Sequence, residues 1–523
     1  MTTEHIQSYL PKNTKAEISG NIAFFPVPTS LIKEVAIELY QAKNLKLKLI
    51  TATDQRETGE GFKIWYVFSV PKEHIFIVPF IQLKDSQEFP SLTPVIHSAY
   101  NHERKIHTFF GLTPNGHPDL RPIILHENWP NNAFPLRKDF NWKTKPAKTH
   151  TPYQFQKVEG EGIYEIPVGP IHAGIIEPGH FRFSVAGEEI MLLEARLGFV
   201  HKGIEKLLEI LPLTDKVRLS EKISGDSSLS HSMAFCQALE NLGDIMVPKR
   251  ALYLRVMYAE LERLANHFGD IGAIMIDTGF NFGGSQGARL REIIMQINER
   301  LTKSRFLRGI NIIGGVTKDI SPKEREALLK DLEKITKDFS EVITIAENSM
   351  SLLNRLKGTG VILQTLAKDY GASGIAAKAT GIAADARVDY PYAAYSDLGF
   401  NEIETEPDGD VYGRFRVRIK EVYASIDIIK NVLQKLPKGP INADAHHIAL
   451  KKNTFAISIV EGWRGQIVYA IFTDSLGNIS RVAPCDPSFL NWPLVGEAGP
   501  GNVVPDFPLI NKSFNLSYSG NDL

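Results

Sequence analysis

Cysteine is nearly absent from this sequence. Only Cys236 and Cys485 occur among its 523 residues. Two cysteines are too few for a disulfide scaffold, and they exclude any site on this chain that needs four thiolate ligands. An excess of basic charge is absent as well, because 59 Lys and Arg residues stand against 60 Asp and Glu residues and leave a formal net charge of -1. Nucleic-acid binding, which requires a basic face, is therefore not expected.

Long apolar runs and cofactor fingerprints are also missing. No stretch of about 18 uncharged apolar residues is present, so the sequence predicts no membrane-spanning helix. The N-terminal residues MTTEHIQSYLPKNTK lack the apolar core of a secretory signal. Residues 283–289 (GGSQGAR) contain neither the Lys-Ser/Thr pair of a phosphate-binding loop nor a dinucleotide-binding glycine pattern. We interpret them as a loop that starts a helix, and we assign any NADH chemistry to another subunit.

The remaining composition is that of an ordinary globular protein, with 43% hydrophobic and 23% charged residues. The first part has the pattern of a small α/β domain, because residues 30–43 carry apolar positions at helical spacing and residues 62–83 contain two β-rich runs joined by a turn. Residues 131–162 are polar and aperiodic, which is typical of a linker. We therefore predict one domain at 1–145 and another at 146–523.

The second domain is predicted to be mainly helical with small sheets, which makes the whole chain an α+β protein. Helical periodicity extends over residues 228–243, 249–275, 286–303, 323–356 and 411–436. Strand patterns occupy residues 163–168, 181–185, 190–193, 455–460 and 466–473. The C-terminal residues from 502 onward are expected to form an irregular apolar tail that is buried in a core or an interface.

Residues 101–139 carry several short motifs at a specific spacing. These motifs read ERK, FFG, GHPDLRPI, ENW and PLRKD. Together they resemble the signature of the small peripheral subunit of respiratory complex I, usually called the C subunit in bacteria. The resemblance implies that the first domain docks against other parts of a complex and is not catalytic.

From Gly169 onward the chain resembles the large subunit shared by complex I and the nickel–iron hydrogenases. The segments that carry this resemblance are 169–183 (GPIHAGIIEPGHFRF), 196–207 (RLGFVHKGIEKL), 410–418 (DVYGRFRVR) and 460–465 (VEGWRG). Both domains lie in one polypeptide, and the loop at 177–180 reads EPGH. This combination is similar to the large subunits of energy-converting membrane hydrogenases of the hydrogenase-4 and formate hydrogenlyase type.

The nickel–iron ligands of such hydrogenases are absent. The resemblance places the four ligand cysteines at Ser224, Ser227, Ser488 and Asn491. Thiolates bridge two metals and ionise near neutral pH, whereas a serine hydroxyl stays protonated and an asparagine amide is neutral. We therefore expect no metal on this chain, and we expect these four residues to line an emptied cavity. The two cysteines are expected to be buried thiols.

In complex I the corresponding cavity takes a quinone headgroup, and the resemblance implies that a His and a Tyr hydrogen-bond its carbonyl oxygens. His180 matches the His position if the extra residues of its loop are an insertion. The Tyr position falls on Gly225. Asp226 and His231 are nearby polar groups that could substitute for the missing phenol. His180 and Asp226 are thus candidate catalytic residues.

Glu205 and Arg387 complete the candidate catalytic residues, each with an alternative interpretation. An acidic residue in the first turn of a helix is expected from the helix dipole alone, whereas the resemblance puts Glu205 near the cavity on a proton route. Arg387 lies between Asp385 and Asp389, a pattern typical of a structural ion pair, whereas the resemblance allows it to line the cavity.

These expectations combine into one functional hypothesis. The chain is a peripheral subunit on the cytoplasmic face of the membrane that passes electrons from an iron–sulfur cluster of a partner to a quinone-like acceptor, coupled to ion translocation. The expected partners are a small iron–sulfur subunit, a ferredoxin-like subunit and antiporter-like integral membrane subunits. This chain itself binds no cofactor. Two alternatives remain, a non-catalytic scaffold subunit and an active nickel–iron hydrogenase.

Overall fold

The computed structural model describes residues 3–12, 14–149, 151–173, 175–443 and 448–523. Its N-terminal part is built around a five-stranded sheet with the order β1-β2-β5-β4-β3. The elements of this part are α1 (Thr3–Gln7), β1 (Glu17–Ser19), β2 (Ile22–Pro26), α2 (Ile32–Ile37), β3 (Lys46–Gln55), β4 (Gly61–Val70), β5 (Ile75–Leu83), β6 (Glu88–Pro90), α3 (Tyr100–Phe110) and β7 (Thr113–Asn115). In this sheet β2 and β5 pair in parallel, and the other neighbours pair antiparallel. The hairpin predicted within residues 62–83 is confirmed as β4 and β5.

A long segment without regular structure follows. The described residues between Asn115 and Ile163 belong to no helix or strand. They are nevertheless held to the rest of the chain, because Arg121 Nη1 lies 2.6 Å from Glu194 Oε1 of the second part. The predicted domain boundary at 145/146 falls in this segment and stays a prediction.

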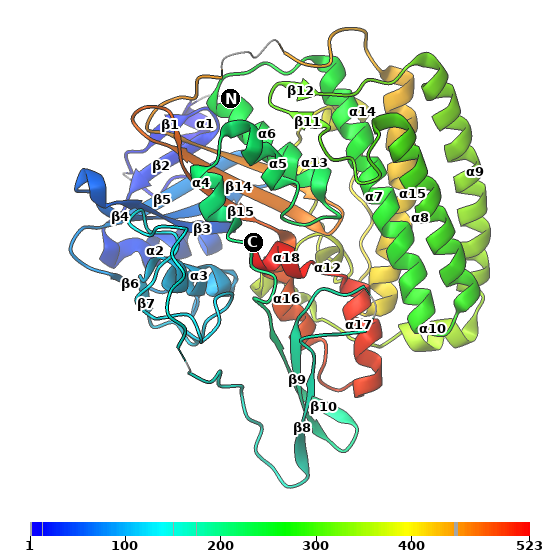
Figure 1. Cartoon of the computed structure of the whole chain (residues 1–523), viewed down its shortest axis with the longest axis horizontal. Coiled ribbons are helices and arrows are strands. Elements are labelled where there is room, and N and C mark those ends of the chain that lie inside the picture. Colours follow the sequence, from blue (N-terminus) through cyan, green and yellow to red (C-terminus); the bar gives the residue numbers. More distant parts are fainter. Residues whose placement is uncertain (1–2, 13, 150, 174, 444–447) are drawn as a thin grey trace.

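The second part combines a helical bundle with small sheets. Its elements are β8 (Ile163–Val168), β9 (His180–Ala186), β10 (Glu189–Arg196), α4 (Ile204–Ile210), α5 (Leu213–Ser220), α6 (Ser228–Leu242), α7 (Lys249–Asp277), α8 (Asn281–Thr302), β11 (Asn311–Ile312), β12 (Gly315–Val316), α9 (Pro322–Glu347), α10 (Met350–Leu356), α11 (Gln364–Asp369), α12 (Gly374–Lys378), α13 (Ala386–Asp389), α14 (Tyr395–Leu398), α15 (Val411–Lys435), β13 (Phe455–Gly462), β14 (Gly465–Thr473), β15 (Ile479–Cys485), α16 (Pro487–Glu497), α17 (Phe507–Phe514) and α18 (Tyr518–Asp522). Figure 1 shows the long helices α7, α8, α9 and α15 side by side, and the β8–β10 sheet projecting away from the body. The predicted α+β fold class, with a small α/β domain before a mainly helical domain, is confirmed.

Three local predictions are wrong. Residues 283–289 are not a loop but lie inside α8, where glycines allow close packing on α7. A Cβ on Gly287 would stand 2.5 Å from the Cα of Gly272. The helical pattern at 323–356 is two helices, α9 and α10, because Ser349 caps the second one. The C-terminal tail is not irregular, since it folds into α17 and α18, although it is buried as expected.

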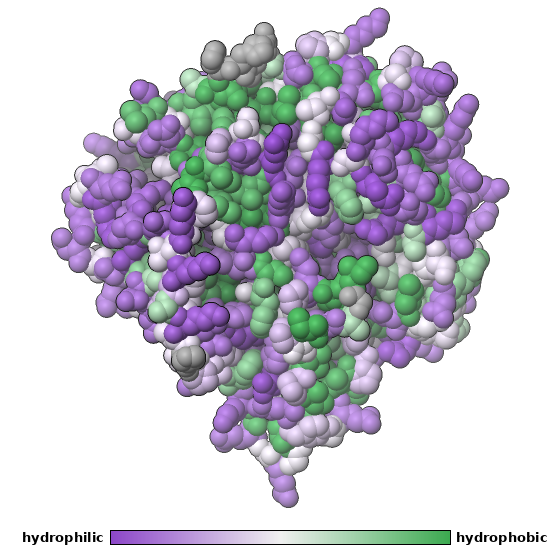
Figure 2. All heavy atoms as spheres, viewed as in Figure 1, coloured by the Kyte–Doolittle hydropathy of each residue, from purple (hydrophilic) through white to green (hydrophobic). Residues whose placement is uncertain are grey.

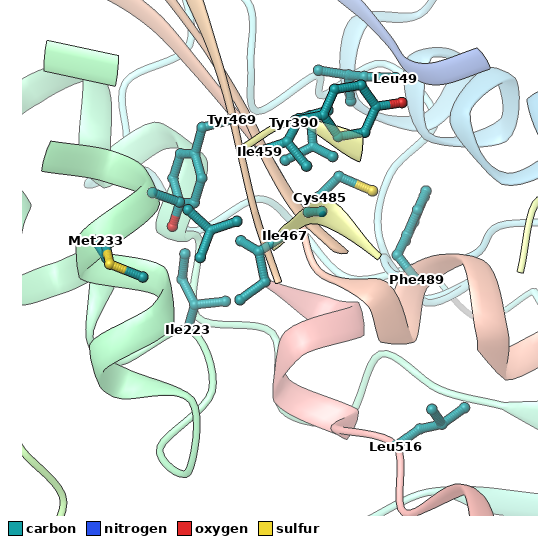
Figure 3. Packing of buried hydrophobic residues seen from close by; sticks show 14 of the residues in the cluster. Leu49, Ile223, Met233, Tyr390, Ile459, Ile467, Tyr469, Cys485, Phe489 and Leu516 are labelled. Carbon is teal, nitrogen blue, oxygen red and sulfur yellow. The ribbon is translucent and has the colours of Figure 1, made fainter. Parts of the chain in front are cut away.

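One hydrophobic core joins the two parts of the chain. Figure 3 shows Leu49 of β3 near Cys485 at the end of β15 and Phe489 of α16. Both cysteines are buried, and burial raises the pKa of Cys485 to about 12, so its thiol stays protonated. Within the described ranges, no helix has both the length and the apolar character that a membrane crossing requires.

Candidate functional site

The structure brings three of the four degenerate ligand positions together. Ser224 and Ser227 precede α6, and Ser488 lies in the first turn of α16; all three side chains are buried. Ser517, just before α18, connects Ser224 to Ser488. The Ser224 hydroxyl donates to Ser517 Oγ at 2.9 Å, and the Ser517 backbone N–H donates to Ser488 Oγ at 2.9 Å.

Asn491, the fourth position, faces a different neighbour. Its amide forms two hydrogen bonds with the backbone of Ser373, at 3.3 Å from the Ser373 N–H and 3.1 Å to the Ser373 carbonyl. The side chain is buried. Asn491 therefore fixes the segment before α12 against α16, and its hydrogen-bonding groups are used for this structural purpose.

A guanidinium group occupies the space between the serines. Arg464, in the turn between β13 and β14, forms a bidentate ion pair with Asp226 at 2.7 and 2.8 Å. Its Nη1 also lies 3.3 Å from Ser224 Oγ and 3.4 Å from Ser227 Oγ. Burial opposes the charge of Asp226, but the Arg464 guanidinium outweighs it and holds the pKa of that carboxyl below its usual value. The carboxylate and the guanidinium are therefore both charged near neutral pH.

This arrangement does not fit a nickel–iron centre. The donor set consists of neutral hydroxyls and an amide, and the centre already contains a buried cation. A pair of metal ions would find no thiolate there to bridge it. In the part of the chain that the structure describes, no three His, Cys, Asp or Glu residues are grouped so that they could hold a metal ion.

A cavity of about 350 Å³ opens beside the ion pair. Asp226 and Arg464 form part of its wall, and the loop before β9, the helix α17 and the C-terminal segment form the rest. On the face shown in Figure 2, hydrophobic residues lie around α17 and the base of the β8–β10 sheet. The lining residues are Val168, His172, Ile175, Ile176, Glu177, Phe181, Asp226, Asp277, Arg464, Phe507, Pro508, Asn511, Lys512, Asn515, Leu516 and Tyr518. The cavity thus combines apolar walls with a few charged groups, as small-molecule sites do.

His180 lies outside this set of lining residues. It begins β9, its Nδ1 is 3.3 Å from the carbonyl of Gly169, and its ring centroid is 5.3 Å from that of Phe155. Burial lowers the pKa of His180. The imidazole that does line the cavity belongs to His172, which is 2.7 Å from the carbonyl of Gly179. His172 was not selected from the sequence, because it follows a Gly-Pro turn that accounts for it structurally.

His231, the other suggested substitute for the missing phenol, is fully buried. Its Nε2 lies 2.9 Å from Asp486 Oδ2 and its Nδ1 lies 3.1 Å from the Tyr469 hydroxyl. Both ring nitrogens are therefore engaged within the protein. Of the two residues suggested to replace the missing phenol, Asp226 lines the 350 Å³ cavity and His231 does not.

Glu205 forms a buried bridge between the two parts of the chain. It lies in the first turn of α4, and its carboxylate accepts from Lys105 of α3 and Arg481 of β15, each at 2.6 Å. Burial opposes its charge, but these two cations together hold the pKa of Glu205 below its usual value. Glu205 is not among the residues that line the 350 Å³ cavity. Its contacts account for a structural role, and a proton route through it stays a prediction.

Arg387 belongs to a buried ionic cluster and not to the cavity wall. Its guanidinium lies 2.6 Å from Asp385 Oδ2 and 2.8 Å from Glu421 Oε2, and these side chains are at most 1% exposed. Lys378 joins the cluster at 2.7 Å from both carboxylates. The pattern of alternating charge at 385–389 thus corresponds to a structural ion pair that extends to α15.

Known proteins resemble this chain over most of its length. Residues 25–146 match the family described as respiratory-chain NADH dehydrogenase, 30 kDa subunit, and residues 277–456 match the 49 kDa subunit family. Formate hydrogenlyase subunit 5 of Escherichia coli K12 is 31% identical over 95% of this chain and 88% of its own length. Hydrogenase-4 component G of the same organism is 32% identical over 95% and 87%.

Two further comparisons extend the likeness to other complexes. The fused C/D subunit of the NADH-quinone oxidoreductase of Phocaeicola vulgatus is 28% identical over 86% of this chain and 90% of its own. A chain in the structure of the membrane-bound sulfane sulfur reductase, described as an archaeal respiratory membrane complex, superposes with a TM-score of 0.65 at 25% identity. That match covers 69% of this chain and 99% of the other.

Proposed function

Since the chain belongs to the family of fused large subunits that join the 30 kDa and 49 kDa domains of complex I and its hydrogenase relatives, we propose that it is a nickel-free member that reduces a quinone-like acceptor. It receives electrons from an iron–sulfur cluster of a small partner subunit. A ferredoxin-like subunit and antiporter-like integral membrane subunits complete the assembly. This chain lies at the cytoplasmic face of the membrane, and its electron transfer is coupled to ion translocation.

The observation that carries this proposal is the position of Arg464. Its guanidinium stands among the hydroxyls that replace metal ligands, and its charge is fixed by Asp226. A guanidinium held at this point is a hydrogen-bond donor that favours negative charge developing on an oxygen atom during reduction. The site is therefore suited to an organic oxygen acceptor and not to a bimetallic centre.

The cavity supplies a place for such an acceptor. Its volume of about 350 Å³ lies within the range of about 300 to 1,000 Å³ that is usual for small-molecule sites. Phe181, Ile176 and Leu516 offer apolar contacts to a ring. Reduction of a quinone to a quinol consumes two electrons from the partner's cluster and two protons. The His172 imidazole at the wall can pass those protons, whereas Asp226 stays ionised in its pair with Arg464.

A binding experiment on the purified complex tests this proposal. Decylubiquinone binding should weaken about tenfold in Ile176→Trp, because the indole fills the cavity, and several-fold in Asp226→Asn, which alters its polar wall. Leu363→Trp is the matched control, since Leu363 is 66% exposed and does not line the cavity. His180→Ala tests the sequence-based assignment of His180, and from its position it should leave affinity unchanged.

The scaffold alternative has support of its own. The serines and Arg464 are already hydrogen-bonded to one another, so the former ligand positions need no bound molecule. A wild-type complex that does not bind decylubiquinone, or that binds it equally well in Ile176→Trp, would favour a scaffold over an oxidoreductase subunit.

A further inference from the structure

A second and larger cavity lies between the N-terminal sheet and the β13–β15 sheet. Its volume is about 670 Å³. Residues of β3 and β4 line one side, and residues around β13, β14 and β15 line the other. None of the residues assigned above to the acceptor cavity contributes to it. The proposed function therefore leaves this cavity unexplained.

The walls of this cavity carry an excess of negative charge. Six carboxylates and three cations line it, so its net charge is -3, whereas the whole chain carries only -1. Three of the carboxylates are neutralised, since Asp54 pairs with Arg56, Glu60 with Lys63 and Glu209 with Lys138. Glu17, Glu57 and Asp474 have no ion pair with any residue that the structure describes.

Aromatic rings form the inner wall. Trp65 of β4 packs against Phe455 of β13 and Phe472 of β14, each with a centroid distance of 5.2 Å, and these two rings stack on each other at 5.1 Å. Phe80 of β5 packs on the same indole at 4.6 Å, and the ammonium of Lys63 already lies 5.6 Å above the Phe80 ring. These faces can accept the alkyl stems and the cationic ends of arginine and lysine side chains.

Two buried acceptors point to a ligand that donates hydrogen bonds. The Glu209 side chain is only 4% exposed, and its Oε1 has no hydrogen-bond partner among the described residues; Arg481 Nη1 lies 3.9 Å away, beyond hydrogen-bond distance. Gln55 Oε1, at the end of β3, is likewise buried without a partner among the described residues. Both residues line this cavity. Because buried polar atoms are usually satisfied, these two indicate an incomplete set of contacts.

We propose that this cavity, with its acidic opening and aromatic wall, binds an arginine- and lysine-rich segment of a partner protein. Its amide and hydroxyl groups, on Asn453, Thr454 and Ser475, suit the backbone of a peptide better than they suit a polyamine, which carries no amide groups. The cationic side chains reach Glu17 and Glu57 and lie along the rings. Such a segment bridges the two sheets and holds the N-terminal part in place.

Fluorescence anisotropy of a labelled acetyl-Arg-Lys-Arg-Lys-amide peptide with the purified full-length chain tests this proposal. The double variant Glu17→Gln/Glu57→Gln should weaken binding about tenfold, because two exposed carboxylates that attract the peptide are removed. The matched control is Glu159→Gln/Glu161→Gln, which removes the same charge from two exposed linker residues. This control variant should change the affinity for the peptide by less than about twofold, because the peptide is expected to contact carboxylates at the cavity and not in the linker.

Three outcomes would overturn the proposal. One is the absence of peptide binding to the wild-type chain at low ionic strength. Another is equal weakening in the two double variants, which would show a general charge effect. The third is competition by spermidine that matches the unlabelled peptide at equal concentration of positive charge, since the site would then recognise a polyamine.

Discussion

Replacing Arg387 by methionine is expected to lower the free energy of unfolding by about 4 kcal/mol, within the range for breaking a buried ion pair. The guanidinium is fully buried and contacts Asp385 and Glu421, whose side chains are also buried. Methionine leaves the two carboxylates with Lys378 at 2.7 Å and leaves Glu421 with the more distant Arg263 at 3.9 Å. Burial opposes the charge of Glu421, and Arg387 is the largest contributor that keeps its pKa well below the usual value, so the variant should bind a proton there.

Chemical denaturation measures this effect, with Arg416→Met as the control. Arg416 lies on the same helix as Glu421, but its ion pair with Glu347 is about a third exposed on both sides. Loss of that exposed ion pair should lower the free energy of unfolding by less than about 1 kcal/mol. The double variant Arg387→Met/Glu421→Gln should recover part of the stability. An Arg387→Met protein as stable as the Arg416→Met protein would contradict the structural role of Arg387.

The second large effect is expected at Arg464. Its side chain is 5% exposed and holds Asp226, two serine hydroxyls and the carbonyl of Asn515. Arg464→Met should lower the free energy of unfolding by about 3 kcal/mol, because buried hydrogen-bonding groups lose their partner. Arg464→Lys should cost less, since it keeps the charge but not the planar fork that binds a carboxylate through two nitrogens.

A double-mutant cycle with Asp226→Asn isolates the ion pair. The coupling free energy should be about 1 to 3 kcal/mol, as found for residues in direct contact. Arg182→Met is the reference for a surface pair, because Arg182 and Glu165 are 24% and 37% exposed. Coupling near zero between Arg464 and Asp226 would show that the guanidinium is not fixed in the former ligand site.

Much of the fold follows from local pattern. Helices such as α7 and α15 have continuous apolar periodicity, and β4 and β5 are β-rich runs joined by a short turn, so their existence and approximate ends could be predicted. Residues 283–289 could not be placed correctly, because their glycines serve a contact with Gly272 on another helix. The burial of Arg414 and Arg418 on α15 could not be predicted either, since their partners come from distant segments.

In the candidate site, too, local sequence motifs could be recognised, but contacts between distant segments could not be predicted. The four degenerate positions could be found because each lies in a recognisable motif. In the structure Ser517 joins Ser224 to Ser488, and Arg464 joins Ser224 to Ser227, but contrary to expectation none of the four lines the 350 Å³ cavity. Arg464 could not be placed among them, since only the β13–β14 turn carries it across to Asp226. His180 was aligned by treating the extra residues of its loop as an insertion, so the matched position depends on where that insertion is placed. The structure puts His172, eight residues earlier in the same loop, at the cavity wall.

The most direct test of a nickel-free site is the nickel content of the assembled complex, purified from cells grown with ample nickel and measured by inductively coupled plasma mass spectrometry. A nickel–iron hydrogenase from the same cells is the positive control. Because serine hydroxyls and an asparagine amide stand at the four ligand positions, we predict only background nickel in this subunit and unchanged background in Arg464→Lys. Stoichiometric nickel in the wild-type complex would show instead that these side chains do hold a metal centre.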